Sequence, residues 1–154
     1  MPVRTQITGH TKARALDAVP AGFALKMDLT IPAQISAITP LVESVMAVVR
    51  RQAGAKELEI ETALREALAN AIKHGCHGDP TKFVQCQVTF EDDHSVLLTV
   101  RDPGAGFNPK AVPDPTAEDL LYESHGRGIY LIRRLMDEVR FRRRGAEIHM
   151  RSRY

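Results

Sequence analysis

The sequence has few cysteines and no apolar run long enough to cross a bilayer. Its two cysteines, Cys76 and Cys86, lack the paired spacing of a disulfide framework. His74, Cys76 and His77 cluster, but they lack the fourth ligand of a structural zinc site. The first twenty residues contain no apolar segment of the kind that directs export. We therefore expect a cytoplasmic protein with reduced thiols and no membrane association.

A large excess of charge of one sign is also missing. The formal net charge is +2, which is too close to neutrality to indicate a nucleic-acid-binding protein. Arginines nevertheless crowd the C-terminal end, where they occupy Arg133, Arg134, Arg140, Arg142, Arg143, Arg144, Arg151 and Arg153. This local cluster fits either a solvated strand edge and helix face, or a surface for an acidic partner or phosphate.

The length allows one domain. A chain of 154 residues with 44% hydrophobic residues can bury one core, but it is too short for two ordinary domains. Residues 1–20 are polar, without periodicity, and end in Val19-Pro20. We expect them to form a flexible N-terminal arm, followed by a single domain over residues 21–154.

Hydrophobic periodicity predicts the order of the elements within this domain. They are a strand (23–29), two helices (36–52 and 56–74), a hairpin (84–90 with 95–101), a mobile loop (108–124), a helix opened by HGRG, and a last hairpin (139–143 with 146–151). Strands and helices do not alternate one by one. The order therefore predicts an α+β fold, a two-layer sandwich with helices on one face of a mixed, mostly antiparallel sheet.

The helix predicted at 56–74 carries polar side chains on one face. Glu66 and Asn70 are four residues apart, so they project from the same face, and His74 continues the row with Lys73 beside it. Magnesium takes one or two hard oxygen ligands from a protein and the rest from phosphate and water, so this pair of side chains is adequate. Taken alone, the pattern is more typical of an ordinary solvent-exposed helix face than of a site.

A glycine motif, DPGAGF, follows the strand predicted at 95–101. Asp102 can accept a hydrogen bond from an exocyclic amine such as that of adenine, and Gly104 and Gly106 allow the backbone to approach a ligand closely. An ordinary turn after a strand has the same composition.

A second glycine motif, HGRG, opens the third helix. Gly126 and Gly128 leave free backbone N–H groups at a helix N-terminus, where the helix dipole favours phosphate oxygens, and Arg127 adds charge. By itself this short pattern more often marks a flexible helix start than a nucleotide site.

Together these segments resemble a known family. EALANAIKHG, DPGAGF and SHGRGIYLIRRLMDEV, in that order, resemble the N-box and two glycine boxes of the GHKL ATPase superfamily, whose ATP-binding domain has the Bergerat fold. The resemblance is greatest to the small bacterial anti-sigma factor serine/threonine kinases. It spans about Phe23 to Arg151, and three ordered motifs are more specific than any one of them.

The resemblance implies a role for each candidate residue. Glu66 would be the general base, Asn70 would be the magnesium ligand, and Asp102 would be the residue that hydrogen-bonds adenine. Lys73 would contact phosphate, with His74 beside it. Gly104 and Gly106 would line the nucleotide pocket. Gly126, Arg127 and Gly128 would close over the phosphates. The 108–124 loop would form a lid that ATP orders.

One position departs from the family pattern. Family members have Gly-Thr near the last strand, where the threonine hydroxyl supports the adenine-binding aspartate, whereas this chain has Gly145-Ala146. The carboxylate of Asp102 must therefore find water or another donor.

The function implied is that of an anti-sigma factor kinase. It would bind Mg-ATP, phosphorylate an anti-anti-sigma (STAS-type) partner and sequester a sigma factor, as a homodimer without direct contact to nucleic acid. Glu66 favours a hydroxyl or water acceptor, because an imidazole nitrogen already offers a lone pair and needs no strong base.

Other functional classes fit less well or remain open. We expect neither a self-contained sensor histidine kinase nor a topoisomerase, mismatch-repair or chaperone ATPase, because those need helices or a transducer domain for which 154 residues leave no room. The alternative is a non-catalytic module in which ATP shapes a surface that sequesters a sigma factor or another regulator.

Overall fold

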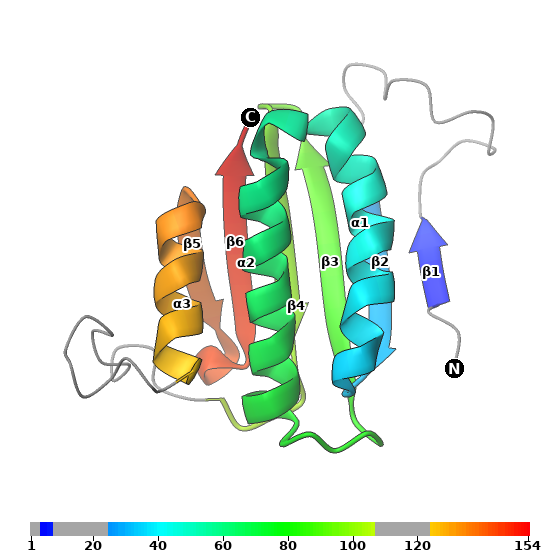
Figure 1. Ribbon diagram of the computed structural model, residues 1–154, viewed down its shortest axis with the longest axis vertical. Coiled ribbons are helices and arrows are strands. Elements are labelled where there is room, and N and C mark those ends of the chain that lie inside the picture. Colours follow the sequence, from blue (N-terminus) through cyan, green and yellow to red (C-terminus); the bar gives the residue numbers. More distant parts are fainter. Residues whose placement is uncertain (1–3, 8–24, 107–123) are drawn as a thin grey trace.

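The computed structural model describes residues 4–7, 25–106 and 124–154, which form two layers (Figure 1). A six-stranded sheet of order β1-β2-β3-β4-β6-β5 forms one layer, and helices α1, α2 and α3 lie together on one of its faces. Every strand pairing in the described ranges is antiparallel. The predicted α+β two-layer sandwich is confirmed, and the described sheet contains no parallel pair.

The elements follow one another as the periodicity predicts. Their bounds are β1 (Arg4–Ile7), β2 (Leu25–Pro32), α1 (Ile38–Gln52), α2 (Glu57–Asn70), β3 (Phe83–Glu91), β4 (Ser95–Arg101), α3 (Ser124–Leu135), β5 (Glu138–Arg142) and β6 (Glu147–Arg153). Among the described residues, no helix has the length and apolar character needed to span a membrane.

Among the described strands and α-helices, β1 is the one that the sequence pattern does not predict. It lies inside the segment expected to be a flexible arm and pairs with β2, with Arg4 opposite Thr30. An edge strand pairs through its backbone and needs no apolar alternation, so its sequence shows no strand signal. The rest of the arm and residues 108–123 of the predicted lid lie outside the described residues.

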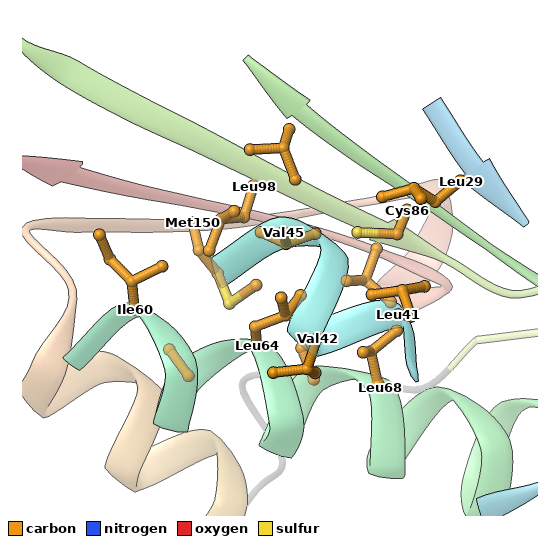
Figure 2. Packing of buried hydrophobic residues seen from close by; sticks show 14 of the residues in the cluster. Leu29, Leu41, Val42, Val45, Ile60, Leu64, Leu68, Cys86, Leu98 and Met150 are labelled. Atoms are coloured by element: carbon orange, nitrogen blue, oxygen red, sulfur yellow. The ribbon is translucent and has the colours of Figure 1, made fainter. Parts of the chain in front are cut away.

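The core fills the space between the sheet and the helices. Figure 2 shows apolar side chains of α1 and α2 pointing towards the strands. Each of the labelled side chains is at most 1% exposed: Leu29, Leu41, Val42, Val45, Ile60, Leu64, Leu68, Cys86, Leu98 and Met150. Because α2 buries this apolar stripe against the sheet, its polar face is turned away from the core and becomes available for a site.

Candidate functional site

The C-terminal end of α2 widens into a π-helical turn, Ala71–Gly75. The N–H of Cys76 donates to the carbonyl of Ala71, five residues back, at 2.9 Å. His77 and Gly78 follow in left-handed conformations, with φ of 52° and 68°. Single π turns of this kind often occur at functional sites. Here the turn brings Gly75 and His77 to the end of β4.

Asp102 comes directly after β4 and packs against this turn. A Cβ atom at Gly75 would collide with the Asp102 carboxylate. A Cβ atom at Gly104 would lie 2.5 Å from the Gly75 carbonyl oxygen and 2.7 Å from Asp102 Oδ1. Two glycines from distant segments therefore enclose one carboxylate, and a side chain on either would displace it.

The carboxylate of Asp102 is partly buried and only partly hydrogen-bonded. Its Oδ1 accepts a hydrogen bond from the Gly104 N–H at 2.8 Å. Burial raises the pKa of Asp102, while the Gly104 hydrogen bond and the nearby His77 oppose this rise. The other carboxylate oxygen keeps its capacity to accept a hydrogen bond from a ligand amine.

Ala146 is the neighbour of Asp102 on the β6 side. The Asp102 N–H donates to the Ala146 carbonyl at 3.0 Å, so the two residues meet through their backbones. Ala146 is 6% exposed and lines the cavity described next. The position expected from the resemblance thus lies beside Asp102, but it presents a methyl group where a threonine would offer a hydroxyl.

A cavity of about 150 Å³ opens beside Asp102. Polar groups reach it from three segments, and apolar side chains form much of its wall. The lining residues are Asn70, Ala71, His74, Gly75, His77, Val100, Asp102, Ala105, Gly106, Ile129, Phe141, Gly145, Ala146 and Ile148. An apolar slot with a few converging polar groups is the usual form of a small-molecule site.

The start of α3 closes the other side of the site. Gly128 is buried, and a Cβ atom on it would lie 2.8 Å from Glu66 Oε2 and 3.1 Å from Asn70 Nδ2. The helix can approach these two polar side chains only because residue 128 is glycine. The three segments singled out by their motifs are therefore brought together: Asn70 and Asp102 line one cavity, and Gly128 contacts Glu66 and Asn70.

The donors at this end fit a magnesium ion bound together with phosphate. The described residues contain no group of three or more His, Cys, Asp or Glu side chains that could hold a metal. Asn70 and Glu66 nevertheless offer hard oxygens side by side next to Gly128. Such a pair suits an ion that takes its other ligands from phosphate and water.

The structure places the other predicted residues around this site in different ways. His74 and Gly106 line the cavity. Burial, together with the charges of Lys73 and His77, lowers the pKa of His74. Lys73 is exposed on the π turn and lies outside the cavity lining. Gly126 and Arg127 belong to the first turn of α3, and Arg127 is exposed.

The sequence motifs missed several residues of the site. Gly75 appears in the sequence only as a helix stop, yet it lies against Asp102. His77, Ile129 and Phe141 also line the cavity, although the sequence assigned none of them to the site. A signal existed for Gly75, which ends the EALANAIKHG segment, and for Ile129, which belongs to the SHGRGIYLIRRLMDEV segment.

Known proteins are similar to this chain over much of its length. Residues 31–152 match the family model of the histidine kinase-like ATPase domain. The anti-sigma F factor of Anoxybacillus flavithermus is 40% identical over 84 residues, which cover 53% of this chain and 56% of that protein. The anti-sigma F factor of Geobacillus stearothermophilus is 40% identical over 88 residues, with the same coverage. The chain thus spans about half the length of the curated relatives it matches.

Proposed function

Because the chain belongs to the family of histidine kinase-like ATPase domains, we propose that it binds Mg-ATP in the cavity beside Asp102 and phosphorylates a protein partner. Family membership implies ATP binding. The similarity to anti-sigma F factors supports a sigma factor as one partner, with a serine or threonine of an anti-anti-sigma (STAS-type) protein as the phosphoryl acceptor. The protein then acts as a cytoplasmic homodimer. The observation that carries the proposal is the convergence of Glu66, Asn70 and Asp102.

The base end of the site recognises adenine. Asp102 accepts a hydrogen bond from the exocyclic amine, and the apolar side chains of Val100, Ile129 and Ile148 line the slot that receives the flat ring. Guanine carries a carbonyl oxygen at the corresponding position. Two acceptors would then face each other, so the site discriminates against GTP.

The phosphate end carries out the transfer. Asn70 would hold magnesium, which would supply positive charge to offset the negative charge of the triphosphate. Glu66 accepts the proton of the acceptor hydroxyl as its oxygen bonds to the γ-phosphorus and the bond to ADP breaks. The N-terminal turn of α3, with Gly126, Arg127 and Gly128, supplies N–H groups and positive charge to the phosphates.

A second candidate function rests on Ala146. Without a hydroxyl at this position, Asp102 lacks one partner that a threonine would give it, and recognition of adenine is weaker. In that case ATP shapes a surface, and the protein sequesters a sigma factor or another regulator without turnover.

Substitution of the base distinguishes these functions. The chain is incubated with γ-labelled Mg-ATP and the STAS-type protein of its own cell, and ATP affinity is measured by calorimetry on the same samples. We expect Glu66→Gln to slow labelling by about 100-fold or more while ATP affinity changes little. Glu59→Gln, a matched change on the same helix, should label its partner at the wild-type rate.

Each other outcome has a defined meaning. Equal labelling by wild type and Glu66→Gln would reject the base assignment. ATP binding and partner binding without any labelling by the wild type would favour the sequestering module. A wild type that gives no heat with ATP and magnesium would end both proposals.

A further inference from the structure

His77 has a backbone conformation that suits another residue better. It follows the π turn and adopts a left-handed conformation with φ of 52°. Histidine tolerates this conformation better than most residues, but glycine adopts it without steric cost. The next residue, Gly78, has the same conformation with φ of 68°. The backbone alone would therefore favour glycine at position 77 as well, so the imidazole has a role of its own.

The fold places this side chain at the base end of the cavity. His77 and Asp102 line the same cavity. Gly75, two residues before His77, lies so close to Asp102 that a Cβ atom on it would collide with the carboxylate. His77 itself is exposed, so its ring lies at the rim of the cavity and not in the core. The ring is therefore within reach of the carboxylate and of solvent.

The Asp102 carboxylate has room for a further donor. Its Oδ1 accepts the hydrogen bond from the Gly104 N–H, and among the described residues its other oxygen accepts none. Ala146 meets Asp102 through the backbone and has only a methyl group to offer the cavity. Each carboxylate oxygen can accept two hydrogen bonds, so the second oxygen can receive both a ligand amine and a donor from the protein.

His77 suits this role better than the other titratable groups nearby. Burial raises the pKa of Asp102, and the charge of His77 opposes this rise, so the two side chains interact. Burial and the charge of Asp102 raise the pKa of the Cys76 thiol, which is a weak donor. Burial and the charges of Lys73 and His77 lower the pKa of His74, which disfavours a positive charge on that ring. Among these described groups, His77 is the one whose charge favours the Asp102 carboxylate.

We propose that His77 is a positioning residue for adenine, and that its ring holds the second oxygen of Asp102 in the orientation that receives the exocyclic amine. The ring has an N–H donor in either protonation state. An exposed side chain also changes rotamer readily, so the ring can turn to the carboxylate as the base enters. This role rests on the proposed binding of ATP in the same cavity.

The first test needs no nucleotide. The pKa of Asp102 is measured from the NMR signal of its carboxyl carbon in the free protein. We expect a higher pKa in His77→Gly than in the wild type, because the charge that opposes the effect of burial is gone. His94→Gly is the matched control, since His94 is also left-handed, with φ of 57°, in the turn between β3 and β4. The control should leave the pKa of Asp102 unchanged.

The second test measures affinity and stability together. Calorimetry with Mg-ATP should show about fivefold weaker binding by His77→Gly and wild-type binding by His94→Gly. Urea unfolding should show little loss of stability in His77→Gly, because glycine relieves the left-handed backbone. A purely structural role would lower stability and affinity together.

A third variant tests whether His77 acts through Asp102. Ala146→Thr places a hydroxyl donor beside the same carboxylate. Its gain in ATP affinity should therefore be larger in the His77→Gly background than in the wild type, which a double-mutant cycle measures. An equal gain in both backgrounds would show that the two positions do not share one carboxylate.

The remaining outcomes separate this role from the binding of ATP itself. An unchanged pKa of Asp102 in His77→Gly would overturn the role, and weaker ATP binding would then come from direct contact with the nucleotide. Equal ATP affinities of the wild type and His77→Gly, or a parallel loss of stability and affinity, would also overturn it while leaving the proposed function intact. A wild type that gives no heat with ATP and magnesium would reject the proposed function, and the role of His77 with it.

Discussion

The two ends of the cavity are held in place differently. At the base end, Asp102 is fixed by its backbone neighbours: Gly75 and Gly104 lie against its carboxylate, and one of them donates a hydrogen bond to it. At the phosphate end, Glu66 and Asn70 lie against Gly128, but the structure shows no hydrogen bond between these side chains and other described residues. The base end is therefore preorganised by the fold, whereas the proposed ligand would have to complete the phosphate end. Substitutions at the base end should accordingly cost more.

The largest effect is expected from Gly75→Ala. The added methyl group occupies the space of the Asp102 carboxylate, so this short side chain has to rotate away from its place in the cavity and give up the hydrogen bond from the Gly104 N–H. We expect a loss of about 3 kcal/mol in ATP binding, roughly 100-fold in Kd by calorimetry. Gly54→Ala is the control, because no other group lies within 4 Å of a Cβ atom there. Equal affinities of both variants would show that the base end is not preorganised.

Asp102→Asn should follow, because it keeps the shape but replaces the free acceptor oxygen by an amide donor. Losing a charged hydrogen bond costs about 2 kcal/mol, so we expect roughly 30-fold weaker ATP binding. Stability should be unchanged or slightly higher in urea unfolding, because the variant removes a carboxylate whose ionisation burial disfavours. A variant that binds ATP normally would remove Asp102 from the site.

The pH dependence gives a second measure of this residue. Burial raises the pKa of Asp102 in the folded protein. Above the pKa of the unfolded state, the ionised carboxylate therefore lowers the free energy of unfolding. Protonation removes this destabilisation as the pH falls through the raised pKa of the folded state. Protonation also removes the proposed hydrogen-bond acceptor for adenine. ATP affinity should therefore weaken on acidification at a higher pH than for an ordinary aspartate, and Asp102→Asn should lack this component.

Gly128→Ala tests the phosphate end and should have a smaller effect. Its methyl group would meet Glu66 Oε2, the far end of a flexible side chain, which can turn aside. We expect about tenfold weaker ATP binding. The cost should shrink when Glu66 is already alanine, which a double-mutant cycle measures. If Gly128→Ala weakens ATP binding equally when Glu66 is alanine, the methyl group collides with the backbone and not with Glu66. The two ends of the cavity would then not differ in how they are held.

Ala146→Thr should have the smallest effect, and it should be a gain. A hydroxyl beside Asp102 supplies the partner that the methyl group lacks, which is worth about 1 kcal/mol, or roughly fivefold tighter ATP binding. Ala146→Val has the same shape without the hydroxyl and should give no gain. If both variants behave alike, packing rather than hydrogen bonding governs this position.

Local patterns in the sequence predicted the fold, whereas the candidate site residues were singled out by the resemblance of three motifs to a known family. The apolar stripes that became α1, α2 and the strands follow from local periodicity, which a sequence displays directly. Asn70 and Asp102 could be predicted to share a site only because their motifs occur in a familiar order. Their meeting in one cavity is a property of the folded chain.

What local patterns did not predict depends on tertiary contacts. The contact of Gly75 with Asp102 joins segments separated by 27 positions in the numbering. Strand β1 shows no strand pattern in the sequence, because pairing through the backbone requires no particular side chains. The π turn depends on a shift of one residue in hydrogen-bond partner, and periodicity arguments place element ends only to within a few residues.

The π turn also limits which changes of chain length the site can accept. It accommodates one more residue than an ordinary α turn between Asn70 and Gly75. Deleting one residue there would rotate everything beyond it by about 100° and turn Gly75 away from Asp102. The turn at 92–94 lies at the end of β4 opposite Asp102 and should accept an insertion readily. In a survey of related sequences, gaps should therefore collect at such outer turns and be absent between positions 70 and 75.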